Sequence, residues 1–252
     1  MPRTARKISS SGIYHIVLRG INKQLIFEDD EDYEKLLETL VKYKEVSQYE
    51  IYAYCLMGNH FHLLLKTNKE ELGLVIKRIA GSYAYWYNTK YKRSGHLFQD
   101  RFISEPVEND KYLLASCRYI HQNPLRAGLC KDIKGYRHSS YRHYANDLSH
   151  LVDIGYIYSI IGKQAFIEFN NEKNDDIFLE TKIKINKIND AEARLIIEKI
   201  SKCENVSQFQ ALETIQRDKY INEFKNNGLS IRQISRLTGI GIAIVRKQKK
   251  TQ

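Results

Sequence analysis

The chain has 252 residues, 42% of them hydrophobic, which is enough for one sizeable domain with a core and a smaller appendage. No apolar stretch approaches the ~18 residues that span a bilayer, and the amino terminus lacks the apolar segment of a signal peptide. We therefore expect a cytoplasmic protein without a membrane partner. The formal net charge of +10 favours a polyanionic partner such as nucleic acid. The four cysteines show no CxxC spacing, which argues against a zinc cluster or a disulfide framework.

The first 107 residues alternate between strand-like and helix-like patterns. The acidic run 28–32 places negative charge at the start of a helix that continues to about residue 47, and Gly58-Asn59 is typical of a hairpin turn. Pro106 suits the end of an edge strand. We predict strands at 13–18, 51–57, 60–65 and 101–107, and helices at 28–47 and 70–91. This order is the split βαβ, ferredoxin-like arrangement of an α+β domain with an antiparallel central sheet.

The rest of the chain is predicted to be helical. A third helix covers about 110–122 and should end at Asn123-Pro124, because proline disfavours the helical conformation of the residue before it. Beyond residue 144 the composition shifts to Lys, Ile, Asn and Glu, with helices at about 190–202 and 207–225 and two short helices around Gly239. We therefore divide the chain into an α+β domain (1–144), a helical linker region (145–205) and a small helical C-terminal region with helix-turn-helix spacing (206–252).

Two histidines in the predicted strand 60–65 are candidates for a metal site. His60 and His62 are two residues apart, so both point to one face of the strand, while Phe61 points to the other and anchors it in the core. Two imidazoles on one face can share a divalent ion. Such a pair is also common on partly buried surfaces, but two histidines in a long apolar strand are costly without a task.

The predicted third helix carries a candidate nucleophile. Tyr119 and Asn123 are four residues apart and so share one helix face, where a phenol and a metal-binding amide oxygen could lie together. Gln122 is the next candidate for that ligand, whereas His121 should point away from Tyr119. By itself, Tyr119 fits an ordinary half-buried tyrosine equally well.

Two segments resemble the signatures of a known family. Residues 57–64 (MGNHFHLL) and 117–129 (CRYIHQNPLRAGL) are similar to the two signatures of the HUH single-tyrosine transposases, in the branch of the REP-associated tyrosine transposases related to insertion sequence 200/605. Further similarity lies in 95–102 and 136–141. The resemblance covers about residues 8 to 144 in the family's order.

The resemblance implies a metal-dependent endonuclease and strand transferase for single-stranded DNA with hairpins. His60, His62 and, as third ligand, Asn123 would hold Mg²⁺ or Mn²⁺, and Tyr119 would form a 5′-phosphotyrosine. Other branches carry glutamine at the third position, where this chain has Asn123. A monomer and a homodimer, with the tyrosine acting in cis or in trans, both fit. The candidate DNA contacts in this domain, each equally compatible with a solvated or core role, are Arg101, Phe102, Arg118 and Arg126.

The C-terminal region and the whole chain each leave alternatives open. Helix-turn-helix spacing with Arg232, Arg236 and Arg246 suits duplex DNA, and a plain helical hairpin with a basic end fits the same residues. The whole chain could instead be a catalytically idle DNA-binding regulator derived from a transposase, which the intact His60, His62 and Tyr119 argue against. A nicking replication initiator usually adds a helicase or a third histidine near the pair, and neither is seen in this sequence.

Overall fold

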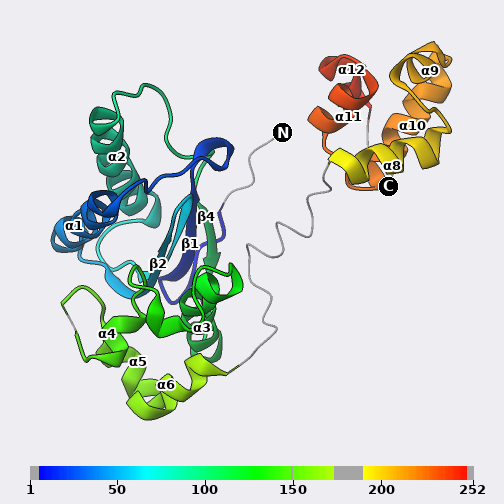
Figure 1. Cartoon of the computed structure of the whole chain (residues 1–252). Coiled ribbons are helices and arrows are strands. Elements are labelled where there is room, and N and C mark those ends of the chain that lie inside the picture. The colour runs from blue at the N-terminus through cyan, green and yellow to red at the C-terminus, as the bar shows by residue number, and fades with distance from the viewer. Residues whose placement is uncertain (1–5, 149, 173–189, 249–252) are drawn as a thin grey trace. The chain divides into compact units, whose positions relative to one another are not determined.

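The computed structural model describes residues 6–148, 150–172 and 190–248 (Figure 1). The chain divides into two compact units, residues 1–179 and 180–252. Within the described ranges, none of the helices combines the length and the apolar character needed to cross a membrane.

The first unit is built on a four-stranded antiparallel sheet in the order β2-β3-β1-β4. The strands are β1 (Ile13–Arg19), β2 (Glu50–Met57), β3 (His60–Lys66) and β4 (Ile103–Pro106). This order is the one expected for the ferredoxin-like arrangement, so the predicted fold class is confirmed. The hairpin at Gly58-Asn59 is also confirmed, and β4 is an edge strand, although it is shorter than the predicted 101–107.

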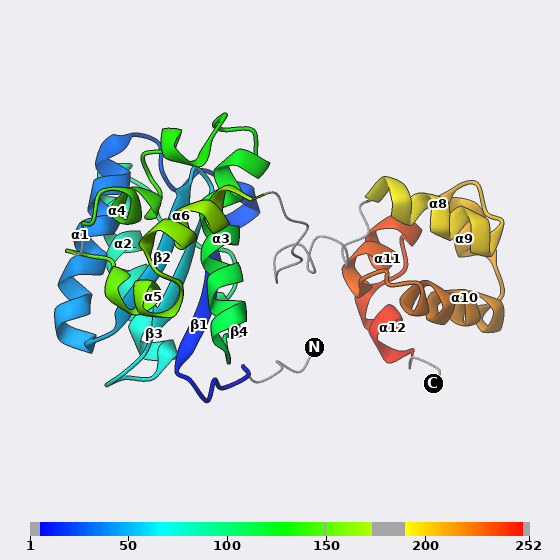
Figure 2. The same ribbon diagram turned by 90° about the horizontal axis from the view of Figure 1, so that it is seen from below.

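Two helices lie on one side of the sheet, and α3 (Asp110–Arg126) lies on the other side with the helices of the first unit that follow it (Figures 1 and 2). The pair on the first side is α1 (Asp30–Ser47) and α2 (Leu72–Lys90), and a 3-10 turn (Ile21–Lys23) precedes α1. Their bounds agree with the prediction from sequence to within two residues at each end. The sheet therefore has one face that packs against α1 and α2 and one face left for α3.

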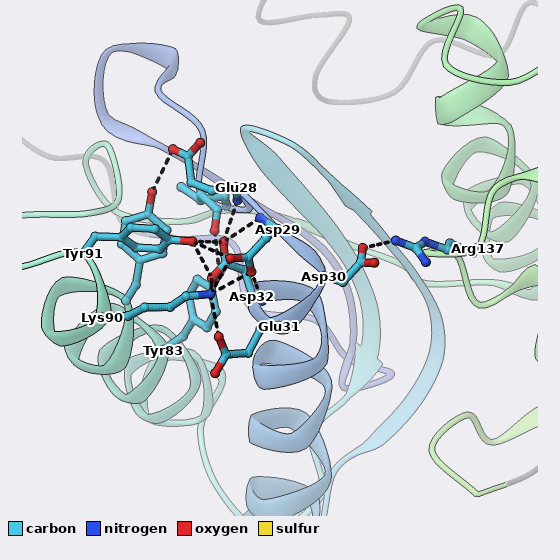
Figure 3. A network of polar contacts seen from close by, with 11 residues as sticks. Glu28, Asp29, Asp30, Glu31, Asp32, Tyr83, Lys90, Tyr91 and Arg137 are labelled. Carbon is cyan, nitrogen blue, oxygen red and sulfur yellow. Dashed lines mark hydrogen bonds and ion pairs between the residues drawn. The ribbon is translucent and has the colours of Figure 1, made fainter.

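The acidic start of α1 is joined to the end of α2 by a polar network (Figure 3). Asp29 and Asp32 form a capping box that satisfies backbone N–H groups at the helix start. Lys90 of α2 lies 2.7 Å from Asp29, 2.8 Å from Glu31 and 2.9 Å from Asp32, and the Tyr91 hydroxyl donates to Asp32. The predicted negative charge at this helix end is therefore balanced by a lysine from the neighbouring helix.

The third helix is longer than predicted. Helix α3 (Asp110–Arg126) contains Pro124, which we expected to end it. Pro124 lies in the last turn, where its missing N–H removes a single backbone hydrogen bond, and Ala127 N–H still donates to Asn123 C=O at 2.9 Å. Asn123 is therefore helical and lies one turn beyond Tyr119.

Between residue 127 and residue 172, the described part of the first unit contains three further α-helices. A 3-10 turn (Ile133–Gly135) and α4 (Tyr141–Ala145) follow α3, and α5 (Ile154–Ile161) and α6 (Lys163–Asn171) follow them. Side chains of α5 and α6, among them Ile157 and Phe166, are fully buried in the core of this unit. The predicted boundary at residue 144 therefore does not coincide with the compact division, because these two helices pack on the sheet domain instead of forming a linker.

The second unit is all-helical over residues 190–248, in agreement with the predicted helical C-terminal region. It contains α8 (Asp190–Ser201), α9 (Val206–Ala211), α10 (Thr214–Asn226), α11 (Ile231–Thr238) and α12 (Ile242–Lys247). The predicted helix 207–225 is two helices, α9 and α10. Gly239, with φ of 69°, ends α11 in the left-handed conformation, and the two short helices around it are confirmed.

Candidate active site

The two histidines of β3 lie on the face of the sheet that packs against α3. The ring centroids of His60 and His62 are 5.2 Å apart, and Phe61 on the opposite face is fully buried, as predicted. In the register of β1 and β3, Arg19 lies directly opposite His60 and Val17 directly opposite His62. Opposite residues of antiparallel strands share a face, so Arg19 belongs to the same surface as the histidines.

A third histidine, His15 of β1, lies against the pair. Its Nε2 is 3.1 Å from Nδ1 of His62, and both side chains are fully buried. We did not predict His15 as a site residue. The sequence did contain a sign of it, because residues 15, 17 and 19 are two apart on the predicted strand and so share one face. Two of them, His15 and Arg19, are polar.

Burial sets the charge state of His15. Desolvation lowers the pKa of His15 to about 4, against an opposing effect of the negative charge of Glu105. The imidazole is therefore neutral near pH 7, with one nitrogen donating and the other accepting.

Helix α3 brings the predicted nucleophile to these histidines. The Tyr119 ring centroid lies 5.9 Å from that of His62 and 5.8 Å from that of His15. Asn123 lies one turn further, with Nδ2 3.4 Å from Nε2 of His62. The two motifs found separately in the sequence thus meet in one buried site, and the extension of α3 past Pro124 is what places Asn123 there.

Two arginines lie close to the phenol of Tyr119. The guanidinium carbon of Arg126 is 5.2 Å from the ring centroid. Burial lowers the pKa of Arg19, whereas the nearby Tyr119 raises it, which indicates that this half-buried guanidinium interacts with the phenol. The sequence alone did not show which basic side chains lie near Tyr119, and the structure places Arg19 and Arg126 there.

Two residues that we considered for the site have other partners. Arg118 is 9% exposed, donates to Glu172 at 3.1 Å and covers the ring of Phe169 at 3.9 Å, so the predicted DNA contact at Arg118 is corrected to a structural contact. Gln122 donates through Nε2 to the backbone oxygens of Asn170 and Glu172, so its amide is engaged at the end of α6. Both side chains hold α3 against the end of α6.

Two other predicted DNA contacts of the first unit, Arg101 and Phe102, lie beside β4, whereas Arg126 lies beside Tyr119 at the end of α3. Arg101 is exposed, and together with Arg6 and Phe102 it lines a groove along this edge strand. The Arg6 guanidinium carbon lies 3.7 Å from the Phe102 ring centroid. Charged and aromatic side chains therefore share this surface.

In the second unit, the three predicted arginines differ in their surroundings. Arg232 of α11 and Arg246 of α12 are exposed. Arg236 donates to Asp190 at 2.6 Å and so joins α11 to α8. Arg236 is also exposed, but its charge is paired with that of Asp190.

The residues around His62 offer a mixed donor set for a metal. In the described ranges, no group of three His, Cys, Asp or Glu side chains is arranged to hold an ion, so two imidazoles and the amide of Asn123 would have to suffice. His60 Nδ1 lies 2.6 Å from Asn59 Oδ1, an acceptor, which leaves the His60 lone pair on Nε2. Imidazole nitrogen and amide oxygen together suit a borderline ion such as Mn²⁺. The donors therefore fit the expected metal.

Comparison with known proteins agrees with this geometry. The family model described as "Transposase IS200 like" matches residues 8–123. A REP-associated tyrosine transposase of Haemophilus influenzae is 26% identical over 158 residues, covering 56% of this chain and 86% of the relative. A solved structure, a REP-associated tyrosine transposase bound to a REP hairpin, aligns with a TM-score of 0.52 at 19% identity, covering 59% of this chain and 88% of the other.

Proposed function

Because residues 8–123 belong to the IS200-like transposase family, we propose that this protein is a metal-dependent endonuclease and strand transferase for single-stranded DNA. The observation that carries the proposal is the meeting of Tyr119 and Asn123 of α3 with His62 of β3 in one site. Enzymes of this family are typically metal-dependent, and the donor set described above fits that dependence.

Tyr119 is the nucleophile in this proposal. Its phenol oxygen attacks the phosphorus of a phosphodiester, the bond from phosphorus to the 3′ oxygen breaks, and that oxygen leaves with a proton as a 3′-OH. The product is a 5′-phosphotyrosine, which keeps the energy of the original bond. A second 3′-OH can reverse the step, so strand transfer needs no ATP.

The surrounding side chains support charge on the phenol. Arg19 and Arg126 place two positive charges beside Tyr119, where they stabilise negative charge that develops on its oxygen. A metal held by His60, His62 and Asn123 would supply Lewis acidity to the phosphate. The site thus provides a nucleophile, cations and metal donors.

The proposed substrate is single-stranded DNA beside a hairpin. The related solved protein is bound to a REP hairpin, and the groove beside β4 offers Arg101 and Phe102 for phosphate and base contacts. We propose that this groove takes the strand next to the cleaved bond.

The test uses single-stranded hairpin oligonucleotides from inverted repeats flanking the gene, incubated with the full-length protein and Mn²⁺. We expect a denaturation-resistant protein–DNA adduct that is absent in Tyr119→Phe and present in the matched control Tyr112→Phe, a second tyrosine of α3. An adduct that persists in Tyr119→Phe would refute the assignment. No adduct on any of these hairpins would favour a DNA-binding regulator without catalysis.

For the second unit we propose duplex DNA binding. Helices α11 and α12 pack on the shared core of this unit, and residues 224–252 contain no acidic residue, so the basic side chains there are not neutralised by neighbours in sequence. Arg232 and Arg246 are the proposed phosphate contacts. We expect Arg246→Ala to weaken binding to duplex DNA and Lys219→Ala, an exposed cation of α10, to leave it unchanged. Equal binding by both variants would refute the proposal, while adduct formation at Tyr119 stays intact in either case.

A further inference from the structure

His15 is a buried polar side chain that the reaction proposed above does not use. It is 0% exposed, it stacks on His62 with ring centroids 5.4 Å apart, and its Nε2 is 3.1 Å from Nδ1 of His62. We infer that His15 is a positioning residue that holds His62 in the tautomer and orientation needed to bind the metal. The inference rests on the proposed metal-dependent function.

The hydrogen bond fixes which nitrogen of His62 can bind a metal. The amide nitrogen of Asn123, which can only donate, lies 3.4 Å from Nε2 of His62, so Nε2 is the nitrogen that carries the lone pair. For Nε2 to carry the lone pair, Nδ1 must carry the proton, and His15 Nε2 must accept it. Ligating histidines almost always donate their second N–H to such a partner, and here the acceptor is an imidazole instead of a carboxylate or a carbonyl.

A carboxylate continues this row of side chains across the sheet. Glu105 of β4 lies directly opposite His15 in the register of β1 and β4, so both share the face that carries His62. A negative charge on that side of His15 favours its remaining proton on the nitrogen away from His62. Glu105, His15 and His62 thus form a row from the edge strand to the proposed metal site.

A purely structural role would not account for this arrangement. Burying two imidazoles has a desolvation cost that apolar side chains of the same size do not have. Apolar side chains would therefore serve a purely structural role better at these two positions. The same His15 ring also meets the Tyr119 ring edge-on at 5.8 Å, so His15 contacts both the proposed ligand and the proposed nucleophile. Its substitution should therefore change metal binding and not only stability.

The test measures Mn²⁺ binding to the full chain by calorimetry without DNA. His15→Phe keeps a ring but removes the acceptor, and we expect Mn²⁺ affinity to fall roughly 10- to 100-fold. His15→Gln can still accept from His62 Nδ1–H and should recover most of the affinity. The matched control Val17→Ala removes packing directly opposite His62 and should lower the unfolding temperature while leaving Mn²⁺ affinity near that of the unaltered protein.

Three results would overturn the inference. If a folded His15→Phe variant binds Mn²⁺ with unaltered affinity, the inference on His15 is wrong and the proposed metal site still stands. If the unaltered protein binds no Mn²⁺, both the inference and the proposed metal site are wrong. If His15→Phe fails to fold, ¹⁵N-histidine NMR of the unaltered protein tests the inference by showing which ring nitrogens of His15 and His62 carry protons. We expect protons on Nδ1 of both His15 and His62, and a proton on His15 Nε2 would contradict the proposed role.

Discussion

His121 should make the stability of the first unit depend on pH. It is fully buried in α3, with Nδ1 2.8 Å from Asn170 of α6 and Nε2 2.8 Å from Ser140. Burial lowers the pKa of His121 to about 4 from its usual 6.5, and the hydrogen bond to Asn170 only partly opposes this. The folded protein therefore holds His121 neutral and joins α3 to α6 through it.

The sign and size of the effect follow from this pKa. Between pH 6.5 and pH 4 the unfolded chain takes up a proton at His121 and the folded protein does not, so stability is complete above pH 6.5 and falls as the pH falls. A difference of about 2.5 pKa units corresponds to about 3 kcal/mol. His121 alone should therefore lower the free energy of unfolding by about 3 kcal/mol between pH 7 and pH 4.

The assay is urea unfolding at a series of pH values for the unaltered protein and His121→Gln. We expect His121→Gln to be less stable at pH 7 and the difference to shrink by about 3 kcal/mol on going to pH 4, because glutamine does not titrate. Phe166→Leu, which alters a side chain packed near the His121 ring, should give a curve parallel to that of the unaltered protein. Parallel curves for His121→Gln as well would refute the reasoning.

Three further predictions concern the site and the second unit. Asn123→Ala should raise the Mn²⁺ concentration for half-maximal cleavage at least about tenfold, and an unchanged Mn²⁺ requirement would remove Asn123 from the donor set. Arg126→Gln should slow single-turnover cleavage about tenfold, because the positive charge that stabilises the phenol oxygen as it becomes negative is lost, and tenfold corresponds to about 1.4 kcal/mol. An unaltered rate would contradict this role of Arg126. Gly239→Ala should destabilise the second unit by about 1–2 kcal/mol, since its φ is +69°, while Gly241→Ala, whose added carbon meets nothing within 4 Å, serves as control in urea unfolding. Equal stability of these two variants would show that the left-handed turn is not required.

The order of strands and helices along the chain was sufficient for the ferredoxin-like fold, and local periods of two and four residues were sufficient for the faces that carry His60, His62 and Tyr119. The sequence was not sufficient for the end of α3, where the rule for proline predicted a stop at Asn123-Pro124 and the cost of one lost hydrogen bond in a last turn proved tolerable. Arg118 shows a different limit. Its pairing with Glu172 joins residues 54 positions apart, and no local pattern reports such a contact.

We did not predict His15 and Arg19 as site residues, although the period of two residues along their strand was visible in the sequence. Both lie on β1, and their alternation with Val17 assigns them to one face. Periodicity alone does not identify the strand neighbour, and it is the pairing of β1 with β3 in the ferredoxin-like order that brings this face to His60 and His62. Likewise, the packing of α5 and α6 on the first unit depends on long-range burial of side chains such as Phe166.

The central claim is that Tyr119 becomes covalently joined to the 5′ phosphate of cleaved DNA. The most direct measurement is mass spectrometry of the protein after reaction with a single-stranded hairpin oligonucleotide and Mn²⁺, followed by fragmentation of the digested adduct. We predict that the peptide containing Tyr119 gains the mass of the fragment on the 3′ side of the cut, attached to the phenol oxygen through its 5′ phosphate. The same mass on another residue, or cleavage that leaves a free 5′ phosphate and no adduct, would contradict the account.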